Sequence, residues 1–294
     1  MILNRYIIIT PAKNEAQFIE KTINSVINQT VKPLAWIIVD DGSSDSTSEI
    51  VKKYTDTYSY IQLVQREKND SRNFGSKVFA IREGFKEINE LEYDFYCNLD
   101  ADVSFEPNYF ETLLKKYDED PILGICGGRV YDLVDGKFIE QKSSDESVAG
   151  PVQFFRKKCY EEIDGYQPSP IGLVDAIAEV TARMKGWETK TFTDVLVKHH
   201  RKMSSANNTN YTIALREGRT DYHLGYHPIW HILRSFERIV TAPIILGSIL
   251  RTFSFAKCYW VKEKRIVDAE FINFIRKEEL KKIRVKLKSL FRKP

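Results

Sequence analysis

Short apolar runs alternate with amphipathic stretches along the first third of the chain. The apolar runs are rich in β-branched and aromatic residues and predict strands at residues 6–9, 36–39, 61–64 and 93–97. The stretches between them repeat apolar residues with helical spacing and predict helices at residues 16–27, 50–54 and 74–88. Strands that alternate with helices and are apolar throughout are typical of an α/β protein with a mostly parallel sheet.

Polar loops follow three of the predicted strands. These loops cover residues 10–15, 40–47 and 98–102. Ligands of open α/β sheets bind outside the carboxyl ends of the strands, so we expect the three loops to line one crevice. The polar side chains expected there are Thr10, Asp40, Asp41, Asp100 and Asp102. The sequence contains neither a Gly-x-Gly-x-x-Gly nor a P-loop motif, which excludes an ordinary dinucleotide or NTPase site.

Asp100 and Asp102 form a D-x-D pair directly after a buried strand. Two carboxylates in that position need partners, because burying an unpaired charge is costly. A divalent cation is one such partner, and Mg²⁺ usually binds one or two carboxylates together with substrate phosphates. The pair therefore predicts a metal-diphosphate site, the alternative being that it decorates a solvated loop.

A different order of elements is predicted between residues 122 and 201. Strands are expected at 122–130, 152–155 and 195–201, helices at 156–163 and 176–184, and an exposed polar loop at 137–147. Asp175 stands at the start of the later helix, where it could act as an N-cap. The last strand ends in His199, His200 and Arg201. Adjacent strand residues point to opposite faces, so at most one of the two histidines can face a given site, and Arg201 could pair with a diphosphate.

Beyond residue 228 the composition shifts toward apolar and then basic residues. The longest uninterrupted apolar stretch, residues 239–250, is shorter than the ~20 residues that span a bilayer, which favours an interfacial or re-entrant segment. Residues 257–294 hold 13 Lys and Arg against 5 Asp and Glu, a net charge of +8. The rest of the chain holds 31 basic and 36 acidic residues, a net charge of −5. This basic amphipathic pattern suggests an acidic partner surface and is typical of an anchor on anionic lipid. The alternative is a helix packed on the rest of the protein.

Composition adds few further constraints. The 294 residues are 43% hydrophobic and 29% charged, which is ordinary for a globular protein with one large domain and an appendage. The four cysteines form no C-x-x-C pair, so we expect reduced thiols in a cytosolic protein. A strand pattern begins near residue 6 with no signal-peptide pattern before it.

Four motifs carry a resemblance to a known family. They are TPAKNE (10–15), VDDGSSDST (39–47), NLDAD (98–102) and GLVDAIAEVTARMKGW (172–187). In this order and spacing they resemble the inverting family 2 glycosyltransferases, which have the GT-A nucleotide-sugar-binding fold. The resemblance covers residues 1–201, and a weaker likeness to bacterial cell-surface polysaccharide members extends through residues 224–228.

The resemblance implies roles for the residues that match these motifs. The residues that would line the nucleoside pocket are Pro11, Ala12, Asn14 and Glu15. Asp41 would accept a hydrogen bond from the imino group of uracil or thymine, because a carboxylate is a pure acceptor. Lys77 would lie near the nucleotide and Asp100 near the ribose. Asp102 would bind the metal, Mn²⁺ or Mg²⁺, that stabilises the leaving diphosphate.

Asp175 would be the catalytic base by the same resemblance. Inversion needs a carboxylate opposite the leaving group, where it takes the proton of the acceptor hydroxyl. Many members carry Glu-Asp where this chain has Val-Asp, so only the second carboxylate is retained. Glu179, one helical turn later on the same face, is the fallback base. A histidine of this region can complete the metal site in family members, which makes His199 and His200 candidate ligands.

We therefore expect a metal-dependent glycosyltransferase of cell-surface polysaccharide synthesis. Its catalytic domain would span residues 1–205, with a nucleotide-binding half at 1–103 and an acceptor half at 104–205. A helical region with the basic tail would follow at 206–294, and the polar stretch 204–211 would form a lid.

The expected partners are a nucleotide-sugar donor, with a UDP-sugar favoured, a glycan or lipid-linked acceptor, and an anionic membrane contacted peripherally from the cytoplasmic side. No nucleic-acid partner is expected. One alternative is a nucleotidyltransferase, which would need a glycine-rich, basic nucleotide loop near its first strand. The other is a non-catalytic carbohydrate- or nucleic-acid-binding module, which predicts no turnover.

Overall fold

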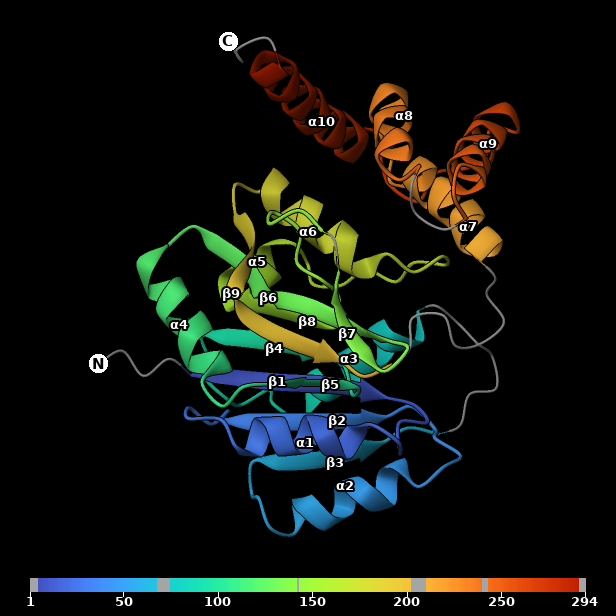
Figure 1. The fold of residues 1–294 in the computed structure, drawn as a ribbon. Coiled ribbons are helices and arrows are strands. Elements are labelled where there is room, and N and C mark those ends of the chain that lie inside the picture. The colour runs from blue at the N-terminus through green and yellow to red at the C-terminus, as the bar shows by residue number, and fades with distance from the viewer. Residues whose placement is uncertain (1–4, 68–74, 142, 202–209, 240–242, 291–294) are drawn as a thin grey trace. The chain divides into compact units, whose positions relative to one another are not determined.

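The structure is a computed structural model that describes residues 5–67, 75–141, 143–201, 210–239 and 243–290 (Figure 1). The chain divides into two compact units, residues 1–203 and 204–294. Most of the predicted lid, residues 204–209, lies outside the described residues.

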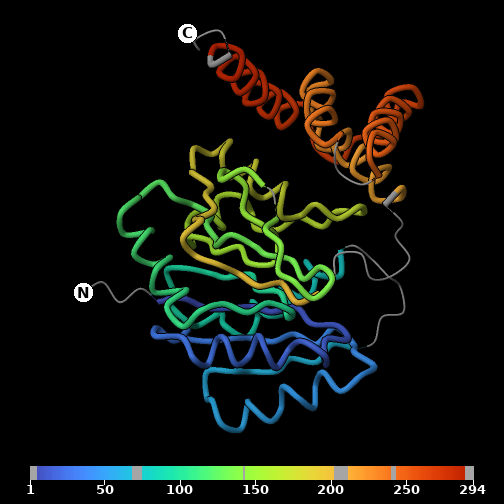
Figure 2. Tube along the Cα trace, in the orientation of Figure 1, coloured from blue at the N-terminus to red at the C-terminus, as the bar shows by residue number. Residues whose placement is uncertain are grey.

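The first unit is built on one mixed sheet (Figure 1). Its described strands are β1 (Tyr6–Ala12), β2 (Ala35–Asp40), β3 (Ile61–Gln65), β4 (Phe95–Leu99), β5 (Val103–Phe105), β6 (Leu123–Val134), β7 (Lys137–Glu140), β8 (Val152–Arg156) and β9 (Glu188–His199). They lie in the order β3-β2-β1-β4-β8-β6-β9-β5, with β7 paired to β6 beside this path. Figure 2 traces the path of the chain through these strands.

Helices cover both faces of this sheet. The described helices of the unit are α1 (Ile19–Ile27), α2 (Thr47–Thr55), α3 (Ser76–Lys86), α4 (Tyr109–Glu119), α5 (Lys157–Glu162) and α6 (Val174–Met184). The buried side chains of α1, α2 and α4 pack on one face, and those of α3, α5 and α6 on the other. This double cover explains why β1 and β2 are apolar almost throughout.

The first four strands of the fold form the parallel part. β1 pairs in parallel with β2 and with β4, and β2 pairs in parallel with β3. Ala12 lies opposite Asp40, and Ile9 lies opposite Asn98. The polar loops that follow β1, β2 and β4 therefore leave the sheet at one edge, as predicted.

The rest of the sheet departs from the expected mostly parallel pattern. β8 is antiparallel to both β4 and β6, and β5 is antiparallel to β9, whereas β9 runs parallel to β6. Residues 137–140, predicted as part of an exposed loop, form strand β7 with every residue exposed. The short β5 after the D-x-D pair was also not predicted, because three residues are too few to show a period.

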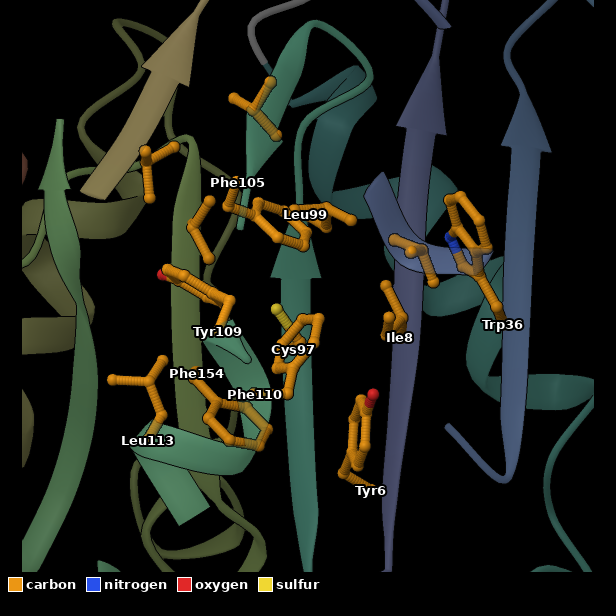
Figure 3. Packing of buried hydrophobic residues seen from close by; sticks show 14 of the residues in the cluster. Tyr6, Ile8, Trp36, Cys97, Leu99, Phe105, Tyr109, Phe110, Leu113 and Phe154 are labelled. Carbon is orange, nitrogen blue, oxygen red and sulfur yellow. The ribbon is translucent and has the colours of Figure 1, made fainter. Parts of the chain in front are cut away.

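Aromatic side chains join the two parts of the sheet in one core (Figure 3). The ring of Tyr6 on β1 lies 4.7 Å from that of Phe110 on α4 and 5.7 Å from that of Phe154 on β8. The Tyr6 hydroxyl is satisfied by the carbonyl of Val31 at 2.7 Å. Burying each such ring contributes about 2 kcal/mol, so this core fixes β8 against the parallel strands.

The second unit is helical in its described residues. Its helices are α7 (Asn210–His223), α8 (Pro228–Glu237), α9 (Leu246–Trp260) and α10 (Ala269–Leu290). A Cβ on Gly218 of α7 would lie 2.1 Å from the carbonyl oxygen of Arg251, so glycine permits the close packing of α7 and α9. The predicted helix in the basic tail is confirmed by α10. None of the helices in the described part of the chain combines the length and apolar character needed to cross a membrane.

Candidate active site

The loops after β1 and β2 are held together by hydrogen bonds. Pro11 and Ala12 end β1, and the carbonyl of Ala12 accepts from the backbone N–H of Asp41 at 2.8 Å. Asn14 has a left-handed φ of +57°, a region that asparagine tolerates. Its side-chain oxygen accepts from the backbone N–H of Ser44 at 2.8 Å. Of the residues predicted to bind the nucleoside, Pro11, Ala12 and Asn14 thus lie beside the loop that carries Asp41.

Asp41 is buried and surrounded by donors. One carboxylate oxygen accepts from Arg66, and the other accepts from the hydroxyl of Ser76. The ammonium of Lys13 lies 3.9 Å from the second oxygen. A carboxylate offers about four lone-pair sites, so Asp41 retains the capacity to accept a further hydrogen bond.

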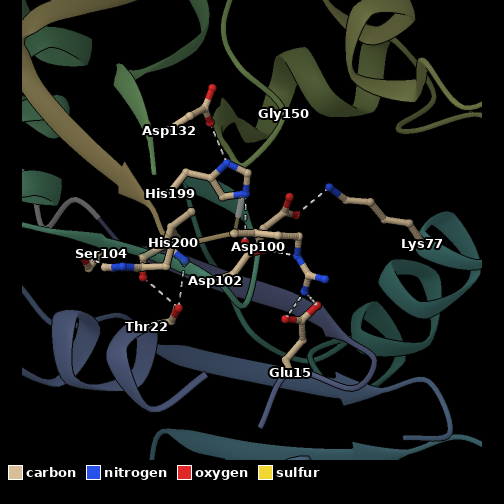
Figure 4. Close-up of polar contacts among 12 residues, drawn as sticks. Glu15, Thr22, Lys77, Asp100, Asp102, Ser104, Asp132, Gly150, His199 and His200 are labelled. Carbon is tan, nitrogen blue, oxygen red and sulfur yellow. Dashed lines mark hydrogen bonds and ion pairs between the residues drawn. The ribbon is translucent and has the colours of Figure 1, made fainter. Parts of the chain in front are cut away.

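Lys77 on α3 and Asp100, which follows β4, form an ion pair (Figure 4). The ammonium of Lys77 lies 2.6 Å from a carboxylate oxygen of Asp100. Burial and the neighbouring Asp102 raise the pKa of Asp100, while Lys77 opposes this shift. Burial would lower the pKa of Lys77, but the carboxylates of Asp100, Asp175 and Asp102 together raise it. The charges of three carboxylates therefore act together on the pKa of this one ammonium group.

Asp102 is buried between two cationic side chains. Its Oδ2 accepts from Arg201 Nε at 2.7 Å, and its Oδ1 lies 3.4 Å from His199 Nε2. Burial favours the neutral acid, but contacts with His199 and Arg201 outweigh it and hold the pKa of Asp102 below its usual value. The guanidinium of Arg201 also contacts Glu15, whose pKa burial raises to about 7. Arg201 thus joins the first and third polar loops.

His199 is held by two carboxylates (Figure 4). Its Nδ1 lies 2.8 Å from Asp132 Oδ1, which leaves Nε2 directed toward Asp102. Burial would lower the pKa of His199, but the two carboxylates raise it to about 10. Sequence analysis missed Asp132, since it lies 67 residues from His199 in an ordinary strand pattern. Only the pairing of β6 with β9 places the two residues opposite each other.

His200 points to the other side of the strand. Its Nε2 lies 2.7 Å from the hydroxyl of Ser104, and its ring lies edge-on to Phe138 at 5.6 Å. Burial and nearby Lys21 lower the pKa of His200. The expected opposition of the two histidines is therefore present, with His199 on the side of Asp102.

Asp175 lies in the first turn of α6, against the segment that precedes β8. A Cβ on Gly150 would be 2.4 Å from Asp175 Oδ2, so the carboxylate approaches the backbone at this glycine. Leu173, at the N-cap position of α6, has a φ of +69°. A left-handed conformation is costly for a leucine, and it sets the direction in which α6 begins. No side chain caps the backbone N–H groups at this helix start, so Asp175 is not an N-cap.

Glu179 is buried one turn after Asp175 and holds the segment before β8. Its Oε1 accepts from the backbone N–H of Val148 at 2.9 Å and from Gln153 Nε2 at 3.1 Å. Burial and the charge of Asp175 raise its pKa to about 8. Its geometry suits a structural role in positioning this segment.

A carboxylate and an imidazole converge where a divalent cation is expected. Asp102 Oδ1 is buried and has no hydrogen-bond partner among the described residues. Oxygen and imidazole ligands suit Mn²⁺, and a cation that also binds substrate phosphates needs only one or two protein ligands. The described residues hold no cluster of three or more His, Cys, Asp or Glu side chains arranged as a metal site. The pair of Asp102 and His199 fits a cation that is completed by a diphosphate.

A family model described as glycosyl transferase family 2 matches residues 7–177, more than half of the chain. The chain belongs to glycosyl transferase family 2. The resemblance carried by the four motifs is thereby confirmed, and the family assignment favours a glycosyltransferase over a nucleotidyltransferase or a non-catalytic module.

Curated relatives match a limited part of the chain. Glycosyltransferase GlyA of Streptococcus pneumoniae is 27% identical over 122 residues, 40% of this chain and 16% of GlyA. Poly-beta-1,6-N-acetyl-D-glucosamine synthase of Staphylococcus aureus is 29% identical over 115 residues, 39% of this chain and 26% of the synthase. The chain therefore matches well under half the length of these relatives, one of which synthesises a polysaccharide.

Solved structures share the fold. TarS of S. aureus in complex with UDP-GlcNAc superposes with a TM-score of 0.53 at 18% identity, covering 88% of this chain and 76% of that one. A mannosyltransferase of Pyrobaculum calidifontis in complex with GDP-Man and Mn²⁺ gives a TM-score of 0.56 at 15% identity, covering 99% and 88%. With the family match, these likenesses confirm the predicted GT-A type fold.

Proposed function

We propose that this glycosyltransferase transfers one sugar from a UDP-sugar to a hydroxyl of a glycan or lipid-linked glycan in cell-surface polysaccharide synthesis, with inversion at the anomeric carbon. The observation that carries the proposal is the clustering of three carboxylates around Lys77. Its ammonium lies 2.6 Å from Asp100, Asp175 lies against Gly150, and the charges of Asp100, Asp175 and Asp102 raise the pKa of Lys77. A base and the carboxylates of a donor site must lie this close if one displacement is to use both.

Asp175 acts as the base in this proposal. Its carboxylate takes the proton of the acceptor hydroxyl while the hydroxyl oxygen forms a bond to the anomeric carbon and the bond to the diphosphate breaks. Asp175 is only half-buried, whereas Glu179 already accepts hydrogen bonds from the backbone N–H of Val148 and from the side chain of Gln153. This difference favours Asp175 over Glu179 as the base.

Lys77 and Arg201 lie beside the carboxylates as cations that can move onto the donor diphosphate. Asp102 and His199 would hold Mn²⁺ or Mg²⁺, and His200 would not, because it bonds Ser104. A bound divalent cation would neutralise charge that develops on the leaving diphosphate. Asp100 would approach the ribose, and Pro11, Ala12, Asn14 and Glu15 would line the nucleoside pocket.

A uracil base is favoured because Asp41 keeps an acceptor site beside Arg66 and Ser76. Part of the same proposal is the location at the cytoplasmic face of an anionic membrane, supported by the basic helix α10. Residues 1–205 would form the catalytic domain and residues 206–294 the appended region.

A donor panel tests the proposal. Binding and hydrolysis of UDP-, dTDP- and GDP-sugars are measured with Mn²⁺, with Mg²⁺ and with a chelator. We expect a metal-dependent response to a uridine donor. A response to GDP-sugars alone would overturn the assignment of a UDP-sugar, and equal turnover with the chelator would overturn the metal site.

The base is tested separately with Asp175→Asn. Removing general-base catalysis lowers a rate by about 10²–10⁴-fold, so transfer should fall by that factor while donor affinity is kept. Asp194→Asn, which changes an exposed carboxylate on β9, is the control. Loss of donor binding in Asp175→Asn would assign the residue to structure.

A further inference from the structure

Helices α8 and α9 of the second unit expose a row of large apolar side chains. We call this row the apolar ridge; its members are Ile232, Phe236, Ile245, Ile249, Phe253 and Trp260. The two members on α8 are four residues apart, and those of α9, counted from its N-cap Ile245, are four, four and seven residues apart, so they form one stripe per helix. Phe236 is 66% exposed and Trp260 is 89% exposed. Monomeric soluble proteins seldom expose contiguous apolar surface of this kind without a partner.

The opposite faces of the same two helices bury polar groups. His231 of α8 is fully buried, with Nδ1 2.8 Å from Asp221 Oδ2 and its ring stacked on Phe255 at 4.0 Å. Ser235 of α8 and Arg251 of α9 are buried as well. The inward faces thus carry His231 and Arg251 beside Phe255 and Cys258, while isoleucine, phenylalanine and tryptophan face outward. A surface helix in water turns its polar residues outward, so these apolar outer faces fit helices that meet an apolar medium.

Basic side chains flank the apolar ridge. Lys257 and Lys262 are exposed on either side of Trp260. The ammonium of Lys286 on α10 contacts Glu237 at the end of α8, so this basic part of α10 lies beside α8. Lysine is depleted at protein–protein interfaces, whereas anionic lipid head groups attract it. Tryptophan is enriched where membrane and water meet.

We propose that the apolar ridge inserts into the interfacial layer of an anionic lipid bilayer, with the lysines of α9 and α10 on the head groups. No described helix is suited to crossing a membrane, so α8 and α9 would lie in the surface. The inference deepens the membrane contact of the proposed function and rests on it for the kind of surface. It assigns the membrane contact to helices α8 and α9. It also predicts that part of the binding to lipid does not depend on charge.

Vesicle binding of the full chain separates the apolar part from the charged part. The protein is sedimented with vesicles of phosphatidylcholine and phosphatidylglycerol at low salt and at about 1 M salt, where the Debye length is ~3 Å. We expect binding at low salt that weakens but persists at high salt. The double variant Ile249→Ser/Phe253→Ser should bind at least about tenfold more weakly, because burial of one such side chain is worth about a decade or more.

Matched controls distinguish binding through the apolar ridge from non-specific hydrophobic binding to vesicles. Ile122→Ser removes an apolar side chain of the first unit that is 51% exposed, and it should leave vesicle binding unchanged. Quenching of tryptophan fluorescence by spin-labelled lipid should be reduced in Trp260→Phe and kept in Trp187→Phe. Thermal unfolding and donor hydrolysis of each variant report folding and the catalytic site separately, so failure of one proposal is distinguishable from failure of the other.

Three results would overturn the ridge insertion. The first is no vesicle binding by the folded protein. The second is binding that vanishes at high salt and is unchanged in the double variant, which would assign the contact to α10 alone. The third is a dimer in solution that the double variant dissociates, which would assign the ridge to a second copy of the chain.

Discussion

Gly150 lies directly against Asp175: a Cβ at position 150 would be 2.4 Å from Asp175 Oδ2. The same short segment contacts the D-x-D region on its other side. The carbonyl of Gly150 accepts from Asn98 Nδ2 at 3.2 Å, and that of Pro151 accepts from Asp100 N at 2.8 Å. The position of the proposed base is therefore tied through two residues to the proposed donor site.

Gly150→Ala should slow transfer without weakening donor binding. The added methyl group cannot remain 2.4 Å from a carboxylate oxygen, so either Asp175 or the backbone must move. A displacement of about 1 Å can cost about 10²-fold in rate. Single-turnover transfer and calorimetric donor binding measure the two quantities on the same samples.

Gly136→Ala is the matched control for this prediction. Gly136 has a φ of +79° at the β6–β7 turn, and a Cβ there would meet no atom within 4 Å. The substitution should cost about 1 kcal/mol of stability and leave transfer unchanged. If Gly150→Ala transfers sugar at the wild-type rate, the contact does not position Asp175.

Asp102→Ala should abolish metal-dependent donor binding and turnover. It removes Oδ1, which accepts no hydrogen bond from the described residues, and leaves the cationic side chains of His199 and Arg201 without this carboxylate. Breaking a buried pair from one side also costs about 3 kcal/mol or more of folding stability. Titration of Mn²⁺ in the presence of UDP measures the first effect, and urea unfolding the second. Wild-type Mn²⁺ affinity in a folded variant would exclude Asp102 as a ligand.

Asp132→Asn should weaken metal binding without touching the metal. The carboxylate fixes His199 through Nδ1 at 2.8 Å, and loss of such an outer contact typically costs about 10–100-fold in metal affinity. Asp194→Asn, on the same strand as His199, should leave affinity unchanged. The imidazole resonances of His199 followed by NMR in the metal-free protein give a second readout, since its pKa should fall below about 10.

Glu179 should make the protein less stable as the pH rises. Its pKa is raised from 4.5 to about 8 in the folded protein, so between these values the folded state holds more proton than the unfolded state. The free energy of unfolding must then fall with rising pH over that range. Glu15, with a pKa of about 7, acts in the same direction.

Glu179→Gln isolates this contribution. The variant keeps the acceptor oxygen but cannot ionise, so its stability relative to wild type should rise by on the order of 3 kcal/mol between pH 5 and pH 8. Urea unfolding at both pH values measures the difference. Parallel pH profiles for the two proteins would show that Glu179 ionises normally.

Local patterns predicted the parallel half of the sheet and the placement of its loops. β1, β2 and β4 are continuous apolar runs that end in polar loops, and parallel pairing requires those ends to share an edge. The common edge of the loops that carry the proposed site residues up to Asp102 therefore followed from sequence. His199 and His200 were also expected to point apart, because that depends only on strand periodicity.

Contacts that depend on pairing between distant strands could not be predicted. Asp132 meets His199 only through the register of β6 and β9, and β8 gives no sign of its antiparallel direction in its own residues. The approach of Gly150 to Asp175 depends on both that direction and the left-handed backbone at Leu173. No periodicity encodes such relationships.

The reversal of β8 leaves part of the chain free to change in length. Because β8 runs antiparallel to β4, Pro151 returns to the residue that follows β4, and the backbone bond to Asp100 closes the loop. The segment between Asp100 and Pro151 can lengthen at the open turn around Gly136 without shifting that hydrogen bond. The chain can therefore gain or lose residues at that turn over evolutionary time while the backbone beside the D-x-D pair keeps its geometry.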